Sequence, residues 1–98
     1  MNQTEAEKIQ KMKKEFEEAI HSVEKSAEKA EEIYGKRDAP AMMRMYQKDA
    51  KDLRRFYKLW SQGRYNEADE VGWKMDTAGR ENIPDTVWND IQRKIGTK

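Results

Sequence analysis

The sequence predicts an all-α fold, in which a long N-terminal amphipathic helix with coiled-coil character precedes a compact three-helix unit. Apolar residues recur at heptad spacing in the first third of the chain and at helical steps of three or four after it. No segment alternates at period two, as a half-buried strand would. The 98 residues suit one helical domain over 1–98, with the long helix at 4–35 and three shorter helices at 38–98.

The expected first helix opens with a capping box, in which Thr4 and Glu7 each satisfy a backbone N–H of the other residue. Gly35 can supply its left-handed C-terminal cap. Such a helix is about 45 Å long, whereas a compact domain of this size is ~30–35 Å across. The helix should therefore protrude or pair with a second copy, which predicts a homodimer or a partner-bound helix. The self-association seam consists of Ile9, Met12, Phe16, Ala19, Val23, Ala30 and Ile33.

The second helix should follow a connector at 36–40, with Pro40 in its first turn, where the missing N–H has no cost. Its apolar residues run from Met42 to Trp60 at helical steps, and Gly63 marks its end.

Two shorter helices are expected after it. The third starts at Tyr65 and stops around 78–79, and its short connector predicts that it is antiparallel to the second. The fourth opens at 82–85 and ends at Gly96. Its inner face is lined by Val87 or Trp88, Ile91 and Ile95.

The composition excludes several classes of protein. There is no cysteine, so disulfides, zinc–thiolate sites and thiol catalysis are excluded, and a reducing compartment fits. No apolar run reaches the ~20 residues that a bilayer span needs. The polar, acidic start of the chain is not a signal peptide. We therefore expect a cytoplasmic protein with no membrane partner.

The charges fall into blocks of opposite sign. Segment 36–64 holds nine Lys or Arg against three Asp, whereas segment 65–90 holds seven acidic residues against two basic ones. Such blocks suggest docking within the chain or between subunits, and they leave one clearly basic segment.

Within that segment, five cations follow one face of the second helix. Steps of four, three, four and three carry them along about three turns, or ~20 Å, roughly opposite Leu53 and Trp60. We interpret this basic stripe as a docking strip for an acidic surface of another protein; a solvated face is the alternative. Nucleic acid is a less favoured partner, because Asp49 and Asp52 lie at the edge and the pI is only about 7.9. The basic stripe consists of Arg44, Lys48, Lys51, Arg55 and Lys58.

Three apolar residues are candidates for an exposed contact with a partner: Met42, Met43 and Trp73. Trp73 is out of phase with the inner positions of its helix, and an exposed tryptophan often dominates a protein interface. Methionine adapts to irregular surfaces, although it also fills gaps in cores. Trp60 and Trp88 fall on inner faces and are expected in the core.

No catalytic or metal-binding arrangement emerges from the sequence. The single histidine, His21, makes Glu-x-x-His with Glu18, a spacing that di-iron bundles use. Both residues lie off the apolar seam, however, and should face water. Ser22 and Ser26 lack a third group that would orient His21 as a base. We therefore expect a protein that is not an enzyme and has no metal and no cofactor.

Two short stretches resemble parts of known helical families. Residues 63–68 resemble the turn and second-helix start of a tetratricopeptide repeat, but they occur once, where a solenoid needs several copies. Tyr65, Ala68-Asp69 and residues 83–88 resemble the C-terminal part of the Hha/YmoA family, small helical modulators that bind nucleoid proteins. The long first helix has no counterpart in that family.

These features predict a non-enzymatic protein-binding adaptor, inhibitor or regulatory subunit that acts on a larger macromolecular machine, of bacterial or phage type. Two alternatives stay open. One is a nucleic-acid- or nucleoid-associated modulator that uses the basic stripe, and the other is a structural coiled-coil homodimer that uses the seam.

Overall fold

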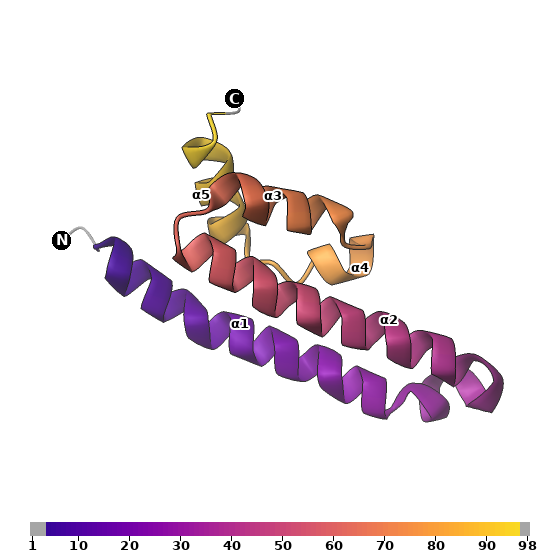
Figure 1. Cartoon of the computed structure of the whole chain (residues 1–98). Helices are drawn as coiled ribbons and strands as arrows, with labels where there is room; N and C mark the ends of the chain where they lie inside the picture. The colour runs from indigo at the N-terminus through magenta and orange to yellow at the C-terminus, as the bar shows by residue number, and fades with distance from the viewer. Residues whose placement is uncertain (1–3, 97–98) are drawn as a thin grey trace.

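The computed structural model describes residues 4–96 as five α-helices joined by short turns, with no strand in that range (Figure 1). The all-α prediction is therefore confirmed. Two long helices lie side by side, and three short ones gather over the C-terminal half of the second (Figure 1). In chain order the helices are α1 (Glu5–Glu28), α2 (Ala30–Ser61), α3 (Tyr65–Lys74), α4 (Thr77–Arg80) and α5 (Asp85–Lys94).

Helices α1 and α2 form an antiparallel hairpin that runs along the 50 Å length of the molecule (Figure 1). At the start of α1, the Thr4 hydroxyl accepts a hydrogen bond from the Glu7 N–H at 3.1 Å, which is one half of the predicted capping box. The apolar stripe of α1 packs onto α2. Phe16 is only 1% exposed, and its ring centroid lies 5.2 Å from that of Tyr57 and 6.5 Å from that of Trp60.

This pairing corrects the expectation that the rest of the chain is too small to cover the first helix. Most of the predicted seam is covered by the chain itself, and only Ile33, which is 58% exposed, faces solvent. A compact globule would leave part of the helix uncovered, but α2 continues without a break from the residue after Gly35 to Ser61 and the molecule is elongated, with a radius of gyration of 14.9 Å. The second helix therefore belongs to the hairpin and not to a compact three-helix unit. Met12, Phe16, Val23 and Ala30 are buried, and Ile9 and Ala19 are half-buried.

The hairpin turn shortens the expected first helix. The backbone bends at Lys29, where φ is −94° and ψ is 5°, so α1 ends at Glu28 and not at 35. Helical hydrogen bonding continues across the bend, since Lys29 N–H donates to Lys25 and Ile33 N–H donates to Lys29. The helical path then breaks at Gly35, whose φ of 83° and ψ of 165° suit only glycine. Gly35 thus breaks the helical path inside α2, and not at the end of the first helix, where the sequence predicted its cap.

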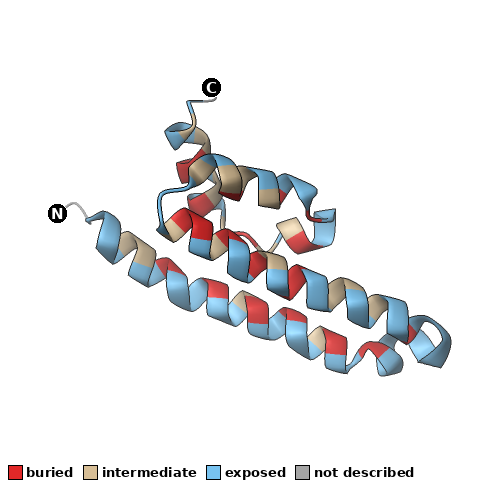
Figure 2. Ribbon diagram, viewed as in Figure 1, coloured by how far each residue is buried: buried red, intermediate tan, exposed pale blue. Residues whose placement is uncertain are grey.

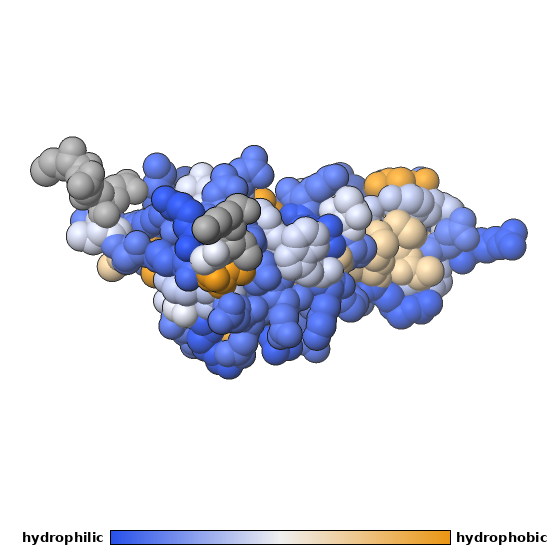
Figure 3. Space-filling model, turned by 90° about the horizontal axis from the view of Figure 1, so that it is seen from above, coloured by the Kyte–Doolittle hydropathy of each residue, from blue (hydrophilic) through white to orange (hydrophobic). Residues whose placement is uncertain are grey.

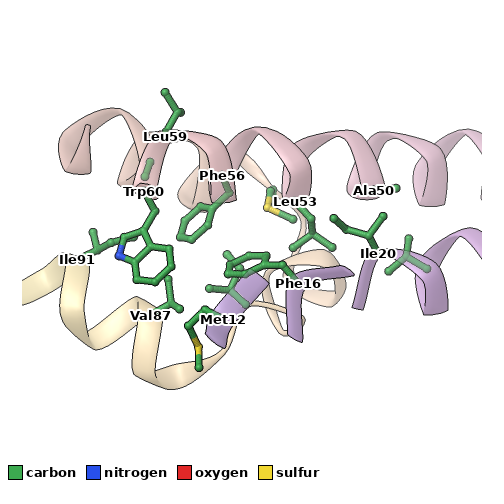
Figure 4. Close-up of a cluster of buried hydrophobic side chains, with 14 residues drawn as sticks. Met12, Phe16, Ile20, Ala50, Leu53, Phe56, Leu59, Trp60, Val87 and Ile91 are labelled. Carbon is green, nitrogen blue, oxygen red and sulfur yellow. The ribbon is translucent and has the colours of Figure 1, made fainter. Parts of the chain in front are cut away.

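One core joins the hairpin to the short helices. Figure 4 shows Phe16 from α1, Trp60 and Phe56 from α2, and Val87 and Ile91 from α5 converging on this core. Burial is confined to the inner faces of the helices (Figure 2). The buried cluster consists of Met12, Phe16, Ile20, Val23, Ala50, Leu53, Phe56, Leu59, Trp60, Ala68, Met75, Ile83, Val87 and Ile91.

The third predicted helix is divided in two. α3 ends at Lys74 because Met75 is extended, with φ −70° and ψ 152°, and its side chain turns into the core. Asp76 then caps α4 by accepting from the Gly79 N–H at 2.7 Å. The Arg80 guanidinium donates to the carbonyls of Gly72, Trp73 and Met75, which holds α4 against the end of α3. The helical spacing of the apolar residues continued across this break and concealed it.

Candidate protein-binding surface

All five residues of the basic stripe are exposed on α2. They lie on the face opposite Leu53, which is fully buried. α1 covers one flank of α2, and α3 and α4 contact α2 elsewhere, so the face opposite Leu53 is left to solvent (Figure 2). The sequence-based placement of the basic stripe on a free helix face is therefore correct.

Most cations of the basic stripe have no partner within residues 4–96. Only Lys48 forms an ion pair, with Asp52 at 2.8 Å, and this hydrogen bond raises the pKa of the Lys48 ammonium. No hydrogen bond or ion pair reaches the other four from the described residues: Arg44, Lys51, Arg55 and Lys58. Four of the five stripe cations thus have no hydrogen-bonded carboxylate within residues 4–96, and of these four Arg55 is approached by Glu67.

The outer face of α1 provides a contrast in the same molecule. It also points away from the core, and it carries Lys11, Lys14, Glu18 and Lys25, all exposed. There Glu18 lies one turn after Lys14, and a pair of opposite charge at this spacing reduces repulsion on the face. A mixed outer face is therefore compatible with this hairpin, and the uniform charge of the α2 face is not a requirement of the fold.

Acidic residues of α3 approach one edge of the basic stripe. A small crevice of about 170 Å³ between α2 and α3 is lined by Lys48 and Arg55 on one side and by Glu67 and Glu70 on the other. The docking of basic and acidic blocks that the charge pattern suggests thus occurs here within the chain. It reaches only this edge of the basic stripe.

The three predicted apolar contact residues do not form one surface. Trp73 is 58% exposed at the end of α3, with its ring at 70° to the Trp88 ring and 5.4 Å away. The Arg80 guanidinium lies 4.8 Å from the Trp73 ring centroid, so the exposed ring is held in place from two sides.

The two methionines lie on α2 near the hairpin turn, with Met42 half-buried and Met43 exposed. Ile33 and Tyr34, also exposed, lie in the same turn region. Figure 3 shows a mainly hydrophilic surface, on which hydrophobic residues are exposed near the turn end of the hairpin. Sequence reasoning assigned Ile33 to the seam and so missed its exposure.

The histidine faces solvent, as expected. His21 and Glu18 are both exposed, and His21 lines a shallow hollow of about 480 Å³ with Glu24, Lys25 and Met43. Among residues 4–96, no three His, Cys, Asp or Glu side chains are grouped so that they could hold a metal ion.

Two buried carboxyl groups were not anticipated from the sequence. Asp90 accepts hydrogen bonds from the Trp60 indole at 2.9 Å and from Lys8 at 3.2 Å. Burial by itself would raise the pKa of Asp90, but these hydrogen bonds and the Lys8 and Lys94 charges outweigh it and hold the pKa below its usual value. Asp90 thereby joins α5 to α2 and to the start of α1.

Asp49 is buried without such compensation. It is 1% exposed, and its Oδ1 atom has no hydrogen-bond partner among the described residues. Burial, a hydrogen bond with Asp76 and the charge of Asp76 raise the pKa of Asp49 to about 7. Gly79 is required beside it, because a Cβ there would lie 2.6 Å from Oδ1. The sequence placed Asp49 at the edge of the basic stripe. Asp49 lies one helical turn before the buried Leu53, and this spacing could have predicted that Asp49 is buried.

No family model matches the chain, and neither the curated proteins nor the solved structures contain a significant match to it. Neither short resemblance noted in the sequence is therefore supported by a family model. Within the described residues, no helix combines the length and the apolar character needed to cross a bilayer.

Proposed function

We propose that the protein is a non-enzymatic binding protein, an adaptor, inhibitor or regulatory subunit of a larger assembly in the cytoplasm, and that the basic stripe of α2 contacts an acidic surface of its protein partner. The observation that carries this proposal is the row of exposed cations along one free helix face, four of them without an ion pair among residues 4–96. The exposed ring of Trp73, held against Trp88 on α5, is a separate candidate for an apolar contact.

Electrostatic cost supports a function for the stripe. Like charges one turn apart destabilise a helix by ~0.2–0.5 kcal/mol per pair. On the outer face of α1 the Lys14–Glu18 spacing offsets part of this cost, and among the described residues of the α2 stripe only Lys48 has such a partner, Asp52. An acidic partner would be steered to such a face and would associate faster at low salt.

The absence of enzymatic activity belongs to the same proposal. The chain holds one histidine, which is exposed, and no cysteine. General acid–base catalysis would need a positioned group within hydrogen-bonding reach of a reacting atom. Neither His21 nor Glu18 forms a hydrogen bond or ion pair with another described residue that could position it in this way.

A charge-reversal experiment tests the proposal. The variant Arg44→Glu, Lys51→Glu and Lys58→Glu changes three stripe cations that have no partner, and so spares the Lys48–Asp52 pair. The matched control, Lys11→Glu, Lys14→Glu and Lys25→Glu, makes the same change in net charge on the outer face of α1. Each protein is used as bait in a nuclease-treated lysate, and the captured proteins are quantified by mass spectrometry.

We expect one set of proteins to be captured by the wild type and by the α1 control, and to be lost with the α2 variant. With the identified partner, association of the α2 variant should be at least about tenfold slower at low salt. Equal capture by all three baits would mean that the stripe is only a solvated face, and the proposal would fall.

Nucleic acid is the second candidate partner, because the stripe extends ~20 Å along a straight helix and could follow a phosphate backbone. Here the logarithm of the affinity of wild-type protein for duplex DNA or RNA should fall linearly with the logarithm of salt concentration, with a smaller slope for the α2 variant. Failure to bind either duplex at about 50 mM salt would exclude this candidate.

A further inference from the structure

A basic hollow lies at the end of the stripe, where α2 passes into α3. Its volume is about 390 Å³. Four of the residues that line it are cations, and the other two are the nearly buried Leu59 and the exposed Gln62. The cations of this hollow are Arg54, Arg55, Lys58 and Arg64.

The backbone holds the walls of this hollow in place. Gly63, with φ 76°, allows the chain to turn sharply after α2. The Arg64 N–H then donates to the Leu59 carbonyl at 2.9 Å, which brings Arg64 back beside the last turn of α2. Leu59 projects from α2 on the side away from Phe16 (Figure 4), so it can form part of the floor without leaving the core.

Two of the four cations already hold carboxylates in the free chain. Arg54 binds Glu24 of α1 at 2.8 Å, and the Arg64 guanidinium binds both oxygens of Glu67, with 2.8 Å for the bond from Nε. Carboxylates are therefore the groups that these side chains bind in this setting. A planar guanidinium fork suits this two-oxygen geometry.

The other two cations, Arg55 and Lys58, also line the hollow and have no hydrogen bond or ion pair within residues 4–96, although the Arg55 charge contributes to lowering the pKa of Glu67. The negative end of the α2 dipole accounts for a cation such as Lys58 in the last turn, but the dipole effect does not extend far beyond that turn. The hollow thus contains two cations that could bind further carboxylate groups, next to two arginines that already bind carboxylates.

We propose that this hollow is the anchor for an acidic segment of the protein partner, whose carboxylates bind Arg55 and Lys58. The inference rests on the proposed function. It predicts that the partner is bound more tightly at the hollow than along the rest of the stripe. Arg44 and Lys51, which lie outside the hollow, then act mainly by long-range attraction.

The test uses a fluorescent oligoglutamate peptide as the probe and an oligoglutamine peptide of equal length as its control. The variant Arg55→Gln with Lys58→Gln removes the two free cations of the hollow. The matched control, Arg44→Gln with Lys51→Gln, removes the same charge from the part of the stripe that lies outside the hollow. All four side chains that are changed are exposed, so no core residue is altered, and circular dichroism checks each fold.

We expect the hollow variant to weaken oligoglutamate binding at least about tenfold, and the control to weaken it by less than about threefold, at low salt. Equal losses in both variants would leave the stripe as a binding surface but overturn the anchor. No binding of oligoglutamate by the wild type would also overturn the anchor, whereas the bait experiment alone decides the proposed function. Displacement of the peptide by a nucleic acid of equal charge at lower concentration would assign the hollow to phosphate groups instead.

Discussion

Asp49 and Asp90 occupy opposite electrostatic environments in the same small core. Asp90 is surrounded by donors from three helices, which lower its pKa. Asp49 faces the carboxyl group of Asp76, and its pKa is raised to about 7. The two residues therefore contribute to stability with opposite dependence on pH.

Replacement of Asp49 by Asn should stabilise the protein above neutral pH. The folded chain keeps a proton on Asp49 up to pH about 7, whereas the unfolded chain releases it near 3.8. The folded state thus binds more protons in this window, and its stability falls as the pH rises. At pH about 8 we expect Asp49→Asn to raise the free energy of unfolding by at least about 1 kcal/mol, with a smaller effect at pH about 5. Urea unfolding at both pH values, with the exposed Asp38→Asn as control, measures this difference.

Replacement of Asp90 by Asn should have the opposite pH dependence. The charged carboxylate binds Lys8, and the stabilisation that it gives is present above the unfolded pKa and is lost as the pH falls through the lowered folded pKa. We expect Asp90→Asn to destabilise the protein by about 1–3 kcal/mol at neutral pH, and by less in acid. A double-mutant cycle with Lys8→Met should show coupling between the two residues, and additive losses would count against this account.

At the scale of elements, the short helices pack very closely on their neighbours, and this close backbone contact holds them in place as much as the burial of apolar side chains does. α3 lies so near α5 that a Cβ on Gly72 would be 2.5 Å from the Trp88 ring and 3.2 Å from Phe56. Arg80 ties α4 to the end of α3 through three carbonyls. Gly72, Trp88 and Arg80 together set the position of the exposed Trp73 ring.

Replacement of Gly72 by Ala should therefore destabilise the fold, although alanine is the better helix former by ~1 kcal/mol. The added methyl group overpacks the contact with Trp88, and we expect a loss of about 1–3 kcal/mol in the free energy of unfolding. The exposed Asn66→Ala in the same helix should change it by less than about 0.5 kcal/mol. A smaller ring in Trp88→Phe should restore part of the loss, and a lack of rescue would argue against this clash.

At the scale of the whole molecule, the hairpin removes the reason for self-association along the seam. Phe16 and Val23 are buried against the chain itself, and a coiled-coil dimer through them would have to open the hairpin. The structural homodimer expected from the heptad pattern is therefore not favoured by this fold. Exposed apolar groups persist at the turn, where Ile33, Tyr34 and Met43 lie.

We expect the chain to be a monomer at micromolar concentration, because the three exposed apolar residues of the turn, together with Trp73 on α3, offer much less than the ~800 Å² per partner of a standard interface. Sedimentation equilibrium over a range of concentrations measures the mass. A mass that rises with concentration would contradict this prediction. If Ile33→Lys then abolished the rise, the contact would be assigned to the turn.

Local pattern was sufficient to predict much of the fold and the surface. The helical spacing of apolar residues predicted the all-α class, the inner face of α5 and the outward direction of the basic stripe. Stop signals at Gly63 and Gly96 were correct because each has a positive φ that other residues rarely adopt, whereas Gly35 has the same feature but lies inside α2. These features depend on the helical period and on the backbone preferences of single residues, which a sequence carries directly.

Only the tertiary structure shows which segment of the chain packs on each helix face. The seam of α1 is buried by α2 because two helices of similar length pack side by side, which periodicity cannot distinguish from pairing with another chain. The break at Met75 follows from the core that its side chain enters, although the apolar spacing continues through it. The opposite pKa shifts of Asp49 and Asp90 and the hollow between Arg54 and Arg64 arise from contacts across more than one element. The sequence by itself determines which side of a helix is apolar. Which residues are buried, which charges are paired and where the surface is concave depend on segments that the fold brings together.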